Sequence, residues 1–110
     1  GLATWPMELR ETTAGARLRF PEDDRPCDIP LRALRSSHVA NLFVAGRCMA
    51  ASHEAQASIR VIGTCFVTGE AAGLAASLEA QQQPADAAAV ARARERFMLP
   101  HDPAATVVPP

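Results

Sequence analysis

The hydrophobic and polar positions alternate in two short runs near the N-terminus. Residues 5–9 place apolar side chains at every second position, and residues 16–20 repeat the pattern after the Ala-Gly turn signal at 14–15. Alternation with a period of two is typical of a half-buried strand, so the two runs predict a β-hairpin. A charged loop with several prolines follows over residues 21–30. Its continuation, residues 29–34, is expected to be short, extended and apolar along one edge.

The strongest pattern lies within residues 41–73. The apolar run at 42–45 predicts a buried strand, which is followed by a glycine turn at 46–47, a polar loop and a helix over residues 64–80. A helix that begins after such a loop presents unpaired N–H groups and the positive end of its dipole. Strand, glycine turn, charged loop and helix are the parts from which phosphate and flavin sites are built.

Two glycines and an aspartate refine this picture. Gly69 and Gly73 lie on one face of the main helix and cost it about 1 kcal/mol each. They therefore predict a close approach by another backbone, in the simplest case that of a sheet. Asp86 is a good N-cap for a second helix over residues 87–98. The tail, residues 99–110, is rich in proline and alanine and is expected to be disordered or draped over the surface.

Composition limits the classes of function. The 110 residues, 48% of them hydrophobic and with a formal charge of −1, indicate one small soluble domain or part of a larger one. Eleven basic against twelve acidic residues, with 5% aromatic residues, argue against a nucleic-acid partner. Three widely spaced cysteines and the lack of a signal peptide favour a reducing cytoplasm. The apolar run at 61–76 contains Glu70 and is interpreted as a buried helix, not as a membrane span.

Six short segments carry a family resemblance through their order along the chain. They are WPMELR (5–10), DIPLRAL (28–34), NLFVAGRC (41–48), ASHEA (51–55), SIRV (58–61) and GEAAG (69–73). Together they resemble the C-terminal flavin-binding block of a family of FAD-dependent oxidoreductases, distant relatives of the fumarate reductase and succinate dehydrogenase flavoproteins. One such segment would be a weak signal, whereas the ordered set covers about residues 1–98.

The resemblance implies an α+β fold that forms part of a larger parent protein of the α/β class. It would be the C-terminal segment of a FAD/NAD(P)-binding Rossmann-like fold, with a few strands and two helices. Such flavoproteins begin with a G-x-G-x-x-G turn that holds the ADP part of FAD, and the six glycines of this chain never form that pattern. Residues 1–98 are therefore interpreted as the last part of a flavoenzyme, with 99–110 as its tail. The expected partner is the N-terminal FAD-binding portion of the parent.

The resemblance also implies cofactor-binding residues. Gly46 corresponds to a glycine that lets the backbone approach the ribityl and phosphate region of FAD. Related flavoproteins usually have an acid next, whereas Arg47 suits a phosphate or a carboxylate. The start of the main helix is expected to point its N–H groups at the pyrimidine edge of the isoalloxazine, where the reduced flavin is negatively charged. The residues there are Ile62, Gly63, Thr64, Cys65 and Phe66.

His53 and Arg60 stand where fumarate-reductase-like enzymes place a substrate-binding histidine and arginine, which makes them the candidate catalytic residues. A histidine can position or protonate an anionic substrate near neutral pH, and an arginine can hold a carboxylate through two hydrogen bonds. Glu54, implied to lie near the flavin, would orient His53 or pair with Arg60. The alternative is an ordinary loop salt bridge between Glu54 and Arg60, with His53 only capping a turn. Glu8 and Arg10 are expected to form a solvated or structural ion pair.

The cysteines predict neither a metal site nor a catalytic thiol. A zinc site would have to bring distant loops together without any Cys-x₂-Cys pair. Its ligands would be Cys27, Cys48, His53 and Cys65. Cys65 lies in the first turn of a helix, where a thiol can be reactive, but a small buried side chain is the favoured interpretation.

Two classes of function remain. In the first, the chain is the C-terminal fragment of a FAD-dependent oxidoreductase, contributing the flavin-ring side of the FAD site and residues near a small-molecule substrate. FAD would then be held weakly or not at all by this chain alone. In the second, the chain is a truncated, non-catalytic module that self-associates or binds a protein partner. A homo-oligomer is expected because the 42–45 strand and the glycine face of the main helix would lack the sheet that covers them in the parent.

Overall fold

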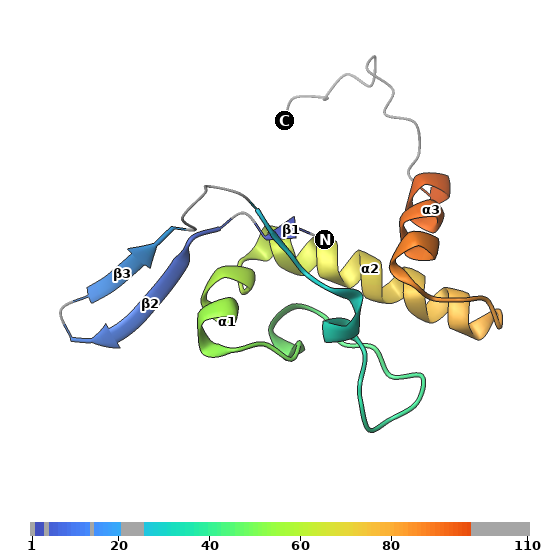
Figure 1. Cartoon of the computed structure of the whole chain (residues 1–110), viewed down its shortest axis with the longest axis horizontal. Helices are drawn as coiled ribbons and strands as arrows, with labels where there is room; N and C mark the ends of the chain where they lie inside the picture. The colour runs from blue at the N-terminus through green and yellow to red at the C-terminus, as the bar shows by residue number, and fades with distance from the viewer. Residues whose placement is uncertain (1, 4, 14, 21–25, 98–110) are drawn as a thin grey trace, which may run out of the picture.

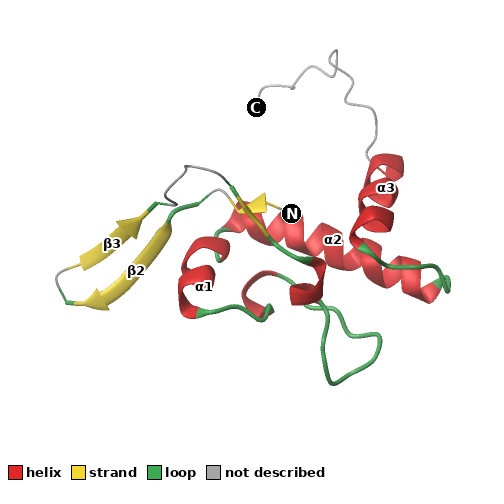
Figure 2. Ribbon diagram, viewed as in Figure 1, coloured by secondary structure: helices red, strands yellow, loops and turns green. Residues whose placement is uncertain are grey.

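The computed structural model describes residues 2–3, 5–13, 15–20 and 26–97. Within them the chain forms two short antiparallel pairs of strands, two 3-10 turns and three α-helices (Figure 1, Figure 2). The predicted α+β class is thereby confirmed. The predicted tail, residues 99–110, lies outside the described residues. The elements are β1 (Leu2–Ala3), β2 (Met7–Thr12), β3 (Gly15–Arg19), β4 (Cys27–Asp28), η1 (Leu31–Leu34), η2 (Gly46–Cys48), α1 (His53–Ile59), α2 (Ile62–Ala80) and α3 (Ala87–Phe97).

β2 and β3 form the hairpin that the alternating pattern predicts. The two strands pair antiparallel, with Met7 opposite Arg19 at the open end. Gly15 begins β3 with a φ of 108°, a conformation that glycine adopts without strain. β3 is exposed along its whole length, whereas β2 packs against α1. The hairpin therefore stands to one side of the helices and touches them through β2 (Figure 1).

The prediction of a buried strand at 42–45 is wrong. This stretch makes a single antiparallel bridge, between Phe43 and Arg35, and Leu42 is 43% exposed. Hydrogen bonds of 2.9 and 2.7 Å on either side of the bridge join the stretch to residues 34–36. A strand needs a neighbour along its length to pair its backbone groups. The described residues supply that neighbour only around Phe43, so the apolar run stays a short extended link.

The stretch predicted to be extended before residue 35 is also different. Residues 31–34 form the 3-10 turn η1, in which the Ala33 N–H donates to the carbonyl of Pro30 at 3.0 Å. Proline is tolerated at the start of a helical turn because the backbone N–H that it lacks would have no hydrogen-bond acceptor within the turn. The turn buries Leu34, which is only 2% exposed, so the expected apolar edge is present in helical form.

The polar loop predicted between turn and main helix is in fact the helix α1. The Ser52 hydroxyl caps it by accepting a hydrogen bond from the Ala55 N–H at 3.2 Å. Ala57 and Ile59 are its buried residues. Seven residues are too few to show a clear helical period, so tertiary packing decides the conformation. The described chain therefore has three helices where two were predicted.

The two predicted helices are confirmed as α2 and α3. α2 begins at Ile62, two residues earlier than predicted, and ends at Ala80 as predicted. Asp86 caps α3 as predicted, because its Oδ1 accepts a hydrogen bond from the Ala89 N–H at 2.7 Å. The two helices pack together, and an exposed ion pair between Arg94 and Glu70 (3.1 Å) links them.

α1 and α2 meet at a bend of 97°. In the described part of the chain, no single helix is long and apolar enough to cross a membrane. These two helices meet that criterion only when they are counted together across the bend. The bend brings the end of α1 and the start of α2 together, close to the N-terminal end of β2 (Figure 1).

The hydrophobic core is thin and lies where α2 meets η1, η2 and β1. Most of the buried apolar residues are alanines, each of which buries little area. The central cluster contains Ala3, Leu34, Met49, Ile59 and Ala72. Several large apolar side chains lie outside the core and are between 43% and 76% exposed. They are Trp5, Leu18, Phe20, Val39, Leu42, Ile62, Phe66 and Phe97.

The close approach predicted at Gly69 and Gly73 is not found among the described residues. A Cβ added at either glycine would meet no atom within 4 Å, so this face of α2 is open. Gly46 shows the opposite. It is buried with a φ of 59°, and a Cβ there would lie 3.2 Å from the Sγ of Cys65. The contact that requires a glycine is therefore the one between η2 and α2.

Substituting these glycines with alanine should give opposite effects on stability. Gly46→Ala forces a side chain into the left-handed region and against Cys65, which should cost about 1–3 kcal/mol. Gly69→Ala, in open space within a helix, should stabilise by about 0.5–1 kcal/mol. Urea unfolding followed by circular dichroism measures both. Equal effects of the two substitutions would contradict the packing of η2 on α2.

Candidate functional site

A small polar hollow lies between β2 and α1. Its volume is about 340 Å³, and it is lined by Glu8, His53, Gln56, Ala57 and Arg60. Four of these residues come from α1 and its C-cap at the spacing i, i+3, i+4, i+7, which corresponds to one face of a helix. The hollow thus brings together His53 and Arg60, the two predicted catalytic residues.

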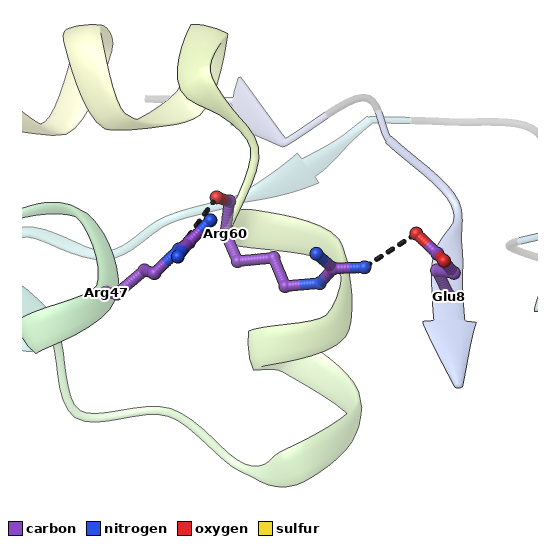
Figure 3. Close-up of polar contacts among 3 residues, drawn as sticks. All are labelled: Glu8, Arg47 and Arg60. Carbon is purple, nitrogen blue, oxygen red and sulfur yellow. Dashed lines mark hydrogen bonds and ion pairs between the residues drawn. The ribbon is translucent and has the colours of Figure 1, made fainter. Parts of the chain in front are cut away.

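Arg60 is held at this hollow by an ion pair with the hairpin. Its Nη2 donates to Oε2 of Glu8 at 2.6 Å (Figure 3). The side chains are 35% and 19% exposed, so the pair is partly sheltered from water. The alternative pairing of Arg60 with Glu54 is wrong. Glu8 was expected to pair with Arg10, whose side chain lies outside the described residues.

The main chain of Arg60 is fixed as well. Its carbonyl accepts a hydrogen bond from Nε of Arg47 at 3.5 Å (Figure 3). The same carbonyl lies 3.8 Å from Sγ of Cys65. Arg47 belongs to η2, so η2 contacts the bend between α1 and α2. The observed partner of Arg47 is therefore a backbone carbonyl, whereas the prediction was a phosphate or a carboxylate.

Glu54 does not line the polar hollow. It lies at the mouth of a second, largely apolar cavity of about 330 Å³, whose walls include Trp5, Phe20 and Ile59. Its own backbone N–H, and then the hydroxyl of Ser52, hold the pKa of the Glu54 carboxyl below its ordinary value. The carboxylate is thus ionised at neutral pH, and it lines a different cavity from Arg60.

The start of α2 is exposed and has no side-chain cap. Val61, the N-cap, makes no side-chain capping bond, and the first turn contains no acidic residue. Ile62 and Phe66 are 74% and 76% exposed, and Gly63 is exposed beside them. The first N–H groups therefore have no side-chain capping acceptor, and exposed apolar side chains flank them. This arrangement fits the polar edge of a flat aromatic ring system.

The other predicted residues at this helix start point inward. Thr64 is buried, and Cys65 packs against Gly46. Thr68, 1% exposed, links the two elements: its Oγ1 accepts from the Gly46 N–H at 3.1 Å and lies 2.9 Å from the Thr64 carbonyl, to which it can donate. Sequence patterns did not single out Thr68, although a threonine inside an apolar helix is a visible sign of such a bond.

Potential metal ligands do not gather in the part of the chain that the structure describes. No group of three or more His, Cys, Asp or Glu side chains there lies close enough to hold a metal ion. The three cysteines are free: Cys27 and Cys48 are exposed, and Cys65 is half-buried.

A family model described as FAD dependent oxidoreductase matches residues 1–96. No curated protein and no solved structure matches the chain. The match covers all the elements that form the polar hollow and the start of α2.

Proposed function

Because this chain belongs to the FAD dependent oxidoreductase family, we propose that it forms the C-terminal part of a flavoenzyme. In this proposal residues 1–98 supply the flavin-ring side of the FAD site and the residues that hold a small anionic substrate. The parent would be a distant relative of the fumarate reductase and succinate dehydrogenase flavoproteins, working in the cytoplasm.

The observation that carries the proposal is the position of Arg60. It lines the polar hollow with His53, and only Val61 separates it from Ile62, the first residue of α2. A substrate held by Arg60 would therefore lie beside a ring placed at the start of α2. This proximity is what a two-electron transfer between substrate and flavin requires.

The chain's own residues have distinct roles in this proposal. Arg60 binds a carboxylate of the substrate through its guanidinium, and His53 positions the substrate or exchanges a proton with it near neutral pH. The N–H groups at the start of α2, from Ile62 to Thr64, stabilise negative charge on the pyrimidine edge of the ring. FAD, when bound, supplies the electron transfer itself.

The adenine and pyrophosphate of FAD need another part of the protein. The six glycines of the chain do not form G-x-G-x-x-G, and the sheets in the described residues are antiparallel pairs of two strands. We therefore assign the ADP moiety, and the Rossmann-like sheet, to an N-terminal portion of the parent. That portion would cover the open face of α2.

A negative charge at the start of α2 should disfavour the reduced flavin. Gly63 has open space for a side chain, so Gly63→Asp in the parent adds a carboxylate to the first turn. We expect the flavin midpoint potential to fall by on the order of tens of millivolts. Ser77→Asp, with the same charge near the other end of α2, is the control. If both variants shift the potential equally, the ring does not face this helix start.

A second candidate function is a non-catalytic module that binds itself or a protein partner. The large exposed side chains favour it, in particular Ile62 and Phe66 on one open stripe of α2. Such a module would need neither His53 nor Arg60. The two candidates are therefore separated by substitutions in the polar hollow, which should matter only for the enzyme.

A further inference from the structure

The ion pair between Glu8 and Arg60 joins parts of the chain that are 52 residues apart. Glu8 lies on β2 of the hairpin, and Arg60 is the C-cap of α1. We propose that Glu8 is a positioning residue: it holds the Arg60 guanidinium at the mouth of the polar hollow so that the remaining donors meet an incoming carboxylate. This inference rests on the proposed function of Arg60 as the anion-binding residue.

The geometry leaves Arg60 able to bind a ligand while Glu8 holds it. The contact with Glu8 uses one terminal nitrogen, Nη2. A guanidinium carries five N–H donors, and among the described residues no other side chain bonds to them. The same hollow contains His53 and Gln56, which can add hydrogen bonds to a ligand held there. The ion pair thus orients the guanidinium and leaves its other N–H donors available for a ligand.

Arg60 is fixed at both ends. Arg47 donates to its carbonyl, and Glu8 accepts from its guanidinium (Figure 3). A free arginine side chain loses much rotational freedom when it binds a ligand, and prior ordering by Glu8 removes part of that loss. The benefit is up to about tenfold in affinity. A purely structural salt bridge would give no such benefit to a ligand.

The charge of Glu8 acts in the opposite direction. A carboxylate beside Arg60 weakens the attraction of the hollow for an anion. Both side chains are partly exposed, and two unit charges about 4 Å apart interact by only about 1 kcal/mol in water. We therefore expect ordering to outweigh repulsion. Glu8→Gln separates the two effects because it keeps an acceptor oxygen and removes the charge.

The test is a titration of the full chain with succinate as the carboxylate probe, followed by NMR at 0.15 M salt. Arg60→Ala should abolish saturable binding. Glu8→Ala should weaken binding about five- to tenfold, whereas Glu8→Gln should stay within about threefold of the wild type. Glu70→Ala, which breaks the Arg94–Glu70 pair between α2 and α3, is the matched control and should bind normally.

Three outcomes have separate meanings. Succinate binding that depends on Arg60 but is unchanged or tighter in Glu8→Ala overturns the positioning role and leaves the proposed function intact. No binding by the wild-type chain argues against the proposed function. In that case the Arg60 Nε–H signal still decides on Glu8: it should be restricted in the wild type and mobile in Glu8→Ala. An equally mobile signal in both proteins overturns the inference.

Discussion

If this chain is part of the flavoenzyme proposed above, Arg60→Ala in that enzyme should lower kcat/KM by about 100-fold or more while the protein still folds. Removing a guanidinium that binds a substrate carboxylate typically costs about 3 kcal/mol in transition-state stabilisation. The folding cost is smaller. The pair with Glu8 is partly exposed, and exposed pairs contribute about 1 kcal/mol or less. Steady-state kinetics and thermal unfolding on the same preparations measure the two effects.

Two further variants make this result specific. Arg60→Lys keeps the charge but loses the planar fork, so it should fall between the wild type and Arg60→Ala. Arg94→Ala removes an arginine of similar pairing, far from the hollow, and should leave turnover unchanged. If Arg60→Ala loses soluble yield and activity to the same degree, Arg60 is a structural residue and the proposed substrate site is wrong.

The elements predicted correctly from sequence are those whose signals are local. The hairpin has alternation on both sides of a glycine turn, and α3 has the cap Asp86 directly before it. α2 is long enough for its helical period to show. The prediction of a strand at 42–45 was wrong because an apolar run becomes a strand only beside a partner strand. Among the described residues this run makes a single bridge, to Arg35.

The site could be predicted only in part for the same reason. Four residues of the hollow share one face of α1: His53, Gln56, Ala57 and Arg60. However, α1 is too short to show a helical period, and the cap Ser52 is its clearest signal in the sequence. The contact with Glu8 spans 52 residues, and no local pattern encodes it. The family resemblance singled out His53 and Arg60, and the structure brings them into one hollow with Glu8.

The isolated chain should associate with itself and should not hold FAD tightly. Its buried core consists largely of alanines, and large apolar side chains such as Ile62 and Phe66 are about three-quarters exposed. Each contributes about 1.5–3 kcal/mol when it is buried, so covering this stripe of α2 with a second copy is favourable. The glycines beside it, Gly69 and Gly73, leave room for a partner to approach closely.

Light scattering and a titration with FAD test both parts of this prediction. We expect a dimer or larger species, and the double substitution Ile62→Ser with Phe66→Ser should weaken association by about 100-fold. Leu18→Ser removes an exposed apolar side chain on the hairpin instead and serves as the control. In the proposed function only the edge of the flavin ring contacts this chain, at the start of α2. The chain has no G-x-G-x-x-G pattern for the adenine and pyrophosphate, so we expect FAD binding to be weak. A stable monomer that binds FAD with micromolar or tighter affinity would mean that this chain holds the whole cofactor by itself.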